Sequence, residues 1–240
     1  MTLQNISHCD SVACKNHPSN DAVVNRYIPS ELIYSLDTKL QHRTVSHLPY
    51  VSMNGNVYAV NNNGGKSGLL MNAMQSGLRQ MHKLLSVYSR ITQIRLETPP
   101  FFSEDSHAQF TKQFKKLLAD VKKKYGTKDI AWLWVRENCI KKGWHYHVVM
   151  WLPYRNCRSS HWVSERWDEI MWDAELLIRF NRLGNPNTLR HFTEKTMRRD
   201  DTDTQLEAVY HWSYLAKTRS KGGGKLHSRD FQSSQLRRGK

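Results

Sequence analysis

Long apolar runs are missing from this sequence, and cysteines are few. The longest apolar stretch, Val148 to Leu152, is far too short to cross a bilayer, so no membrane span is expected. Four irregularly spaced cysteines in 240 residues argue against a disulfide framework. The first residues have neither the basic start nor the apolar stretch of a secretory signal, which predicts a protein that stays in the cytoplasm.

Acidic residues are also scarce relative to basic ones. The chain has 36 Lys and Arg against 21 Asp and Glu, a net charge of +15 with histidine neutral. This excess favours a polyanionic partner, above all nucleic acid, because positive charge supplies the sequence-independent part of its binding. Hydrophobic residues at 39% and aromatic residues at 10% are too many for a disordered polycation, so a folded domain with basic surfaces is predicted.

The chain divides into three parts. Residues 1–45 show no sustained period and predict a loosely ordered arm, residues 46–221 form one domain, and residues 222–240 predict a flexible basic tail. Within the domain, strand and helix periods alternate and predict an α+β fold with helices packed on an antiparallel or mixed sheet. The predicted strands are 55–60, 90–97, 129–137 and 144–152, and the predicted helices are 67–88, 103–125, 164–180 and 204–219.

One predicted strand carries two histidines two residues apart. Side chains alternate between the faces of a strand, so His145 and His147 project from the same face while Tyr146 and Val148 project from the other. Two imidazoles so placed can hold one metal ion, although a His-x-His pair also occurs in strands without one. The pattern leaves open a metal site or two structural histidines.

A carboxylate is expected to complete this cluster. Glu137 closes the preceding strand of the hairpin, but whether it faces the histidines depends on register, and Glu97 at the end of an earlier strand is the alternative. Two imidazoles and one carboxylate suit a divalent ion such as Mn²⁺ or Mg²⁺ acting as a Lewis acid on a phosphate, and zinc fits equally.

Two tyrosines and a lysine recur about sixty residues later. On a helix, Tyr210, Tyr214 and Lys217 stand at i, i+4 and i+7 and share one stripe. A tyrosine can attack phosphorus as a nucleophile, a second can serve a second transfer, and a lysine can neutralise the phosphate. Tyrosines at this spacing also pack against cores, with the polar tip in water.

Together, His145-Tyr146-His147 and Tyr210-x3-Tyr214-x2-Lys217 resemble the HUH endonuclease superfamily, and the second motif matches the two-tyrosine pattern of rolling-circle initiators. The surrounding sequence looks like the inovirus replication-protein family and related prophage-encoded domains over roughly residues 50–222. The resemblance implies a ferredoxin-like or RRM-like sandwich, with a central antiparallel sheet flanked by helices.

The resemblance also implies a reaction. His145 and His147, with Glu137 as third ligand, would bind a divalent metal ion (Mg²⁺ or Mn²⁺), and Tyr214 would attack single-stranded DNA at a replication origin to give a 5′-phosphotyrosine intermediate. Tyr210 would be the partner tyrosine. The freed 3′-OH can prime a polymerase, and a host helicase is a further implied partner.

By the same resemblance Lys217 would position or stabilise the phosphate. Two other functions stay open at this point. One is a sequence-specific DNA-binding protein without catalysis, in which the histidines are structural. The other is a metal-dependent nuclease in which water attacks the phosphate.

Overall fold

The computed structural model describes residues 28–41, 43–98, 106–139, 143–173, 193–218 and 230–236. Its centre is a five-stranded sheet in the order β10-β7-β8-β6-β9, in which every neighbouring pair is antiparallel. The strands are β6 (Arg90–Glu97), β7 (Ala131–Cys139), β8 (Gly143–Pro153), β9 (Thr193–Arg198) and β10 (Phe231–Ser233).

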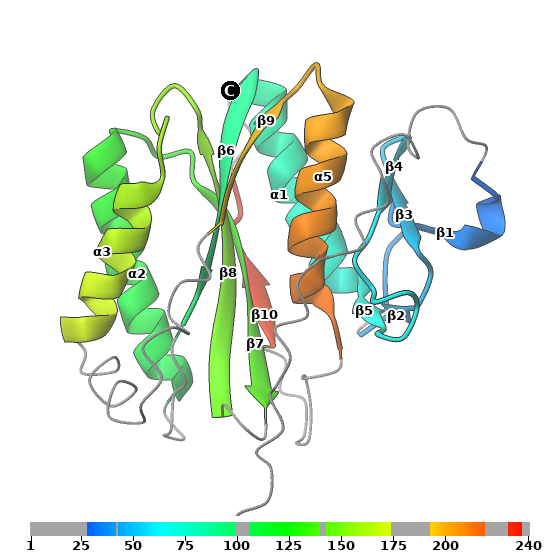
Figure 1. Ribbon diagram of the computed structural model, residues 1–240, viewed down its shortest axis with the longest axis horizontal. Coiled ribbons are helices and arrows are strands. Elements are labelled where there is room, and N and C mark those ends of the chain that lie inside the picture. Colours follow the sequence, from blue (N-terminus) through cyan, green and yellow to red (C-terminus); the bar gives the residue numbers. More distant parts are fainter. Residues whose placement is uncertain are drawn as a thin grey trace, which may run out of the picture.

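Helices cover both faces of this sheet. Figure 1 shows α1 (Met71–Val87) and α5 (Thr202–Ser213) on one side, and α2 (Ser106–Tyr125) and α3 (His161–Asp173) on the other. The predicted α+β sandwich with a central antiparallel sheet is confirmed. None of the helices in the described part of the chain is long and apolar enough to span a membrane.

The central strand β8 separates two hydrophobic cores by its period-two alternation. Val149 and Trp151 are buried against α1 and α5, whereas Val148 and Met150 belong to the core beneath α2 and α3. The two histidines of this strand occupy odd positions, in phase with Val149 and Trp151. They therefore lie on the sheet face that α1 and α5 cover.

A smaller unit lies beside α5 (Figure 1). It contains the three-stranded sheet β1-β3-β4 and the two-stranded pair β2-β5. Its strands are β1 (Ile33–Ser35), β2 (Val45–Ser46), β3 (Tyr50–Met53), β4 (Asn56–Ala59) and β5 (Leu69–Leu70), preceded by a 3₁₀ turn, η2 (Ser30–Leu32). The backbone N–H of Asn61 donates to the Ser213 hydroxyl at 2.8 Å, which ties this unit to the C-terminal end of α5.

Part of the segment predicted to be a basic tail belongs to the sheet. Phe231–Ser233 form β10, which pairs with β7 at the sheet edge. The Asp230 carboxylate binds the guanidinium groups of Arg136 and Arg43, each at 3.1 Å. Three residues are too few for a period to show in the sequence, so the pairing with β7 decides the conformation. The remainder of 222–240, and most of the predicted arm over 1–45, lie outside the described residues.

The helix predicted over 204–219 ends earlier. It begins at Thr202, after Asp201 caps it by accepting a hydrogen bond from the Thr204 N–H, and it ends at Ser213. A 3₁₀ turn, η4 (Tyr214–Ala216), follows, and Lys217 has extended backbone angles. The expectation that both tyrosines and the lysine share one α-helix is therefore corrected.

A close contact between α1 and α5 gives a stability prediction. A Cβ on Gly77 would lie 2.6 Å from the ring edge of Trp212 and 3.2 Å from a methyl group of Leu133. Both neighbours are buried, so Gly77→Ala must displace the indole. Overpacking costs about 1–3 kcal/mol and outweighs the ~1 kcal/mol gained by replacing a helical glycine.

We expect Gly77→Ala to lower the free energy of unfolding by about 1 kcal/mol, measured by chemical denaturation followed by circular dichroism. Arg79→Ala, at an exposed position of the same helix, serves as the control and should change stability by less than about 0.5 kcal/mol. A Gly77→Ala protein as stable as the original would show that α1 and α5 separate without cost.

Candidate active site

His145 and His147 are buried side by side on β8. Each is 4% exposed, and their ring centroids lie 5.1 Å apart with the planes nearly perpendicular. Both lie on the sheet face that α1 and α5 cover, beyond the apolar residues Val149 and Trp151 of the same strand. The shared face that the alternation of the strand predicts is the one observed.

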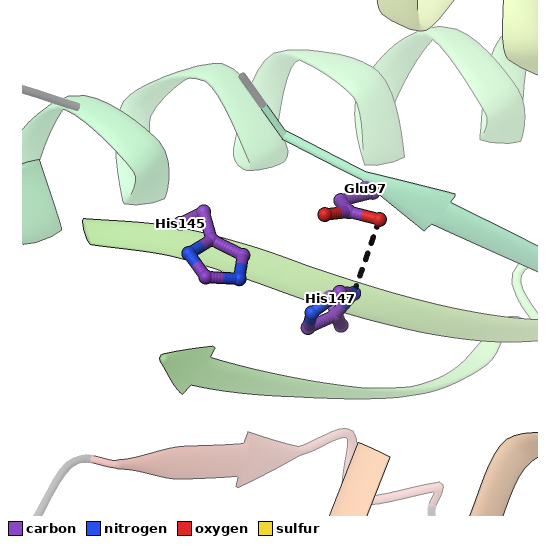
Figure 2. Close-up of side chains that lie close together, drawn as sticks. All are labelled: Glu97, His145 and His147. Atoms are coloured by element: carbon purple, nitrogen blue, oxygen red, sulfur yellow. Dashed lines mark ion pairs between the residues drawn. The ribbon is translucent and has the colours of Figure 1, made fainter. Parts of the chain in front are cut away.

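Carboxylates reach these imidazoles from both neighbouring strands. In the register of the sheet, Glu97 on β6 stands opposite His147, and Glu137 on β7 stands opposite His145. An oxygen of Glu137 lies 3.5 Å from Nε2 of His145 and 3.3 Å from Nε2 of His147. Glu97 approaches the other side of His147, with its oxygen 3.6 Å from Nδ1 (Figure 2). The two carboxylates that the sequence offered as alternatives thus flank the same histidine.

This cluster fits a divalent metal ion. Donor atoms of Glu97, His145 and His147 all lie within 4.8 Å of one another. Two atoms that each bind one ion at about 2.1 Å are themselves roughly 3 to 4 Å apart, so the three side chains would draw closer together to share an ion. The Nδ1 atom of His147 is buried without a hydrogen-bond partner among the described residues. Burying carboxylates and an unsatisfied ring nitrogen together is costly unless a cation compensates.

The two carboxylates can be separated by experiment. Glu97→Gln and Glu137→Gln should each weaken Mn²⁺ binding by about 10–100-fold, because each removes an oxygen charge that contacts or orients an imidazole. Isothermal titration of the purified variants measures the affinity. Glu165→Gln, at an exposed carboxylate on α3, is the matched control and should bind like the original protein. A variant within twofold of the original would exclude that carboxylate from the site.

The tyrosine segment approaches this cluster along β6. Gln93 lies beneath the body of α5, where its amide donates to the Ala208 carbonyl at 3.4 Å. Two residues further along β6, the Arg95 guanidinium lies over the ring of Tyr214, 5.2 Å from its centroid. The next residue on this face is Glu97, about 7 Å beyond Arg95. The end of α5 therefore points toward the histidine cluster.

Tyr214 is accessible and has two cations at its ring. It is 39% exposed, and Nζ of Lys217 lies 4.1 Å from the ring centroid, on a residue that follows η4. Arg95 was not identified from the sequence. The signal that could have found it is its position two residues before Glu97, since the two share a strand face.

Backbone contacts from the smaller unit hold this segment in place. Thr218 donates its backbone N–H to the Gly68 carbonyl at 2.8 Å, and Lys217 forms an isolated antiparallel bridge with Leu69. A Cβ on Gly68 would meet the side chains of Val45 and His47 at 2.5–3.2 Å, so a glycine is needed for the chain to pass there. These contacts hold the backbone of Lys217 and Thr218 beside Gly68 and Leu69, outside the helix.

Tyr210 lies one helical turn before Tyr214 and is half-buried. Its backbone carbonyl accepts a hydrogen bond from the Ser213 hydroxyl at 2.8 Å. The structure therefore gives the two tyrosines unequal access to solvent, with Tyr214 the more exposed.

A thiol elsewhere in the domain is unsuited to attack a substrate. Cys157 is fully buried beneath α2 and α3, and this burial raises its pKa to about 11, so the thiol is protonated at neutral pH. Cys9 and Cys14 lie outside the described residues. Cys157 also belongs to the core on the sheet face away from the histidine cluster.

A family model described as a replication-associated protein, the ORF2 family, matches residues 98–221, more than half of the chain. The chain belongs to this family. The resemblance predicted from the two motifs is confirmed at the level of the family. No curated protein and no solved structure showed significant similarity to the chain.

The match to this family covers the histidine strand and the tyrosine segment but begins at residue 98, directly after β6. Arg95 and Glu97 therefore lie outside it. Yet β6 fills the sheet between β8 and β9, so the folded domain needs this strand. A replication-associated protein acts on DNA, in agreement with the strongly basic composition.

Proposed function

We propose that this replication-associated protein nicks and rejoins single-stranded DNA at a replication origin, and so starts rolling-circle replication of a phage, prophage or plasmid in the cytoplasm of a bacterial host. The observation that carries the proposal is the meeting of two independent groups on one sheet face. Tyr214 is an exposed tyrosine with two cations at its ring, and one of them is Arg95 of β6. The next residue of β6 on the same face is Glu97, which belongs to the buried cluster of histidines and carboxylates.

The cluster would hold a divalent ion, Mg²⁺ or Mn²⁺. His145 and His147 supply nitrogen ligands, and Glu137 and Glu97 supply oxygens from either side. When bound, such an ion polarises the scissile phosphate and stabilises the charge that grows on its oxygens. The surrounding strands fix the ligand geometry, because all four residues lie inside hydrogen-bonded ladders.

Tyr214 would attack the phosphorus. Its phenol loses a proton as the oxygen forms the new bond, and the bond to the 3′ oxygen of the neighbouring nucleotide breaks. The 3′ oxygen leaves with the electron pair and takes up a proton, which gives a 5′-phosphotyrosine and a free 3′-OH. The number of phosphoester bonds is unchanged, so reversal rejoins the strand without a nucleotide cofactor.

The remaining roles follow from position. Lys217 and Arg95 flank the Tyr214 ring, and they would neutralise the phosphate as it reaches the phenol. Tyr210, half-buried one turn earlier, would serve a second strand transfer. The 3′-OH would prime a polymerase, and a helicase of the host would open the duplex ahead of it.

The test uses the full chain with labelled single-stranded DNA from its own replicon and Mn²⁺ or Mg²⁺. We expect an adduct that survives SDS on a denaturing gel, disappears with EDTA and yields a nucleotide-bearing tyrosine peptide by mass spectrometry. DNA binding without an adduct would support a non-catalytic binding protein. Cleavage without an adduct would indicate a nuclease that uses water.

A further inference from the structure

Helix α2 lies on the sheet face opposite α1 and α5 (Figure 1). The histidine cluster is on the face that α1 and α5 cover, so α2 and the cluster lie on opposite faces. Four apolar residues of this helix are buried against the sheet and α3: Phe110, Phe114, Leu117 and Val121. Because an α-helix has 3.6 residues per turn, these four positions also identify the residues on the opposite side of the helix. That side carries five exposed lysines: Lys112, Lys115, Lys116, Lys122 and Lys123. We call four of them, Lys112, Lys115, Lys122 and Lys123, the lysine stripe.

The lysine stripe is exposed and carries no carboxylate of its own helix. All four side chains are solvent-exposed, and the same side also carries Lys116 and the small residues Ala108 and Ala119. The single acid of α2, Asp120, faces α3 and binds Arg166 at 2.8 Å. Lys124 lies off the stripe, because its ammonium group stacks over the Trp162 ring at 5.4 Å.

Four positive charges on about 16 Å of helix repel one another. Lys112 and Lys115, for example, stand three residues apart, which puts their Cβ atoms about 5–6 Å from each other, within the Debye length of ~8 Å at physiological salt. A polyanion removes this repulsion. Duplex DNA carries one negative charge per ~1.7 Å of its axis, so a segment as long as the stripe presents more than enough phosphates.

The form of the stripe favours a duplex over a single strand. Sites for single-stranded DNA combine positive charge with aromatic side chains on which the bases stack. The aromatic residues Phe110 and Phe114 of α2 point into the core, so the stripe offers charge alone. A duplex keeps its bases stacked inside and presents only phosphates to such a surface.

We propose that the lysine stripe binds the phosphate backbone of duplex DNA, while the opposite sheet face receives the single strand. The choice of DNA among polyanions rests on the proposed function. The protein would then hold the double-stranded flank of an origin on one face and present the unpaired segment to Tyr214 on the other.

The test compares two charge-matched triple variants of the full chain. The stripe variant is Lys112→Gln, Lys115→Gln and Lys123→Gln. The control variant is Lys39→Gln, Arg79→Gln and Lys83→Gln, on the smaller unit and α1. Binding of a random-sequence duplex is measured in EDTA from about 50 to 200 mM salt. Each lost phosphate contact lowers the steepness of log affinity against log salt by about 0.9. With three lysines replaced, the slope of the stripe variant should be shallower by about 2.7, and its duplex affinity at 0.1 M salt should fall on the order of 10²-fold.

The control variant should keep most of the duplex affinity, and both variants should cleave a short single-stranded origin oligonucleotide like the original protein. Equal losses in both variants would overturn the proposal, as would a parallel loss of single-strand cleavage. Loss of binding to phosphatidylglycerol vesicles with duplex binding intact would assign the stripe to a membrane surface instead. If the original protein forms no adduct but the salt slopes of the two variants differ as expected, the proposed nicking activity is rejected and duplex binding by the lysine stripe is supported.

Discussion

Tyr214→Phe is expected to abolish the covalent protein–DNA adduct and to lower cleavage of single-stranded origin DNA on the order of 10³-fold or more. The substitution removes only the phenolic oxygen. The aromatic ring stays, and with it the contacts to Lys217 and Arg95, so DNA binding should be preserved. The adduct is measured on a denaturing gel, and single-strand affinity is measured separately by fluorescence anisotropy.

Two further tyrosine variants make this result specific. Tyr210→Phe should retain the first adduct and lose the transfer of a second strand, because its phenol is the less accessible one. Tyr154→Phe, at the far end of β8 where Arg90 stacks over the ring, should behave like the original protein. An adduct that persists in Tyr214→Phe but disappears in Tyr210→Phe would reverse the assigned order.

His147→Ala should reduce Mn²⁺ affinity by at least ~10²-fold and remove metal-dependent cleavage at ordinary metal concentrations. His147 is the side chain that both carboxylates contact, Glu97 at Nδ1 and Glu137 at Nε2. The substitution would therefore remove the imidazole that lies between the two carboxylates. Metal affinity is measured by calorimetry, and cleavage by the same gel assay over a range of Mn²⁺ concentrations.

His161→Ala is the matched control, since this histidine is exposed on α3 and pairs with Glu165 four residues later. It should leave both metal affinity and cleavage unchanged. Both His147→Ala and His161→Ala should still bind duplex DNA through the lysine stripe, and this binding serves as the control that each variant is folded. Normal adduct formation by His147→Ala at micromolar Mn²⁺ would exclude this histidine as a ligand.

The sequence by itself determined that the two histidines of β8 share one face of the sheet. The pleat of a strand is a local property, so the spacing of His145 and His147 was enough to place both imidazoles on one face. The joint presence of this pair and the tyrosine motif was also enough to recognise the family. Helix and strand periods predicted the α+β class, because buried and exposed positions repeat every 3.6 or 2 residues.

The register between neighbouring strands could not be predicted from these local periods. Glu97 comes opposite His147 only because β6 and β8, some fifty residues apart, pair antiparallel in one particular register. A shift of one residue would turn the carboxylate to the other face. The sequence therefore offered Glu97 and Glu137 as alternatives, and the sheet brings both to the same histidine.

Only the tertiary structure decided where the tyrosine helix ends and which sheet edge the C-terminal segment joins. The local pattern would continue α5 past Lys217, but hydrogen bonds to Gly68 and the bridge to Leu69 draw the chain out of the helix at Tyr214. Arg95 enters the site for the same kind of reason. Periodicity reports each segment alone, whereas these features depend on contacts between segments far apart in the chain.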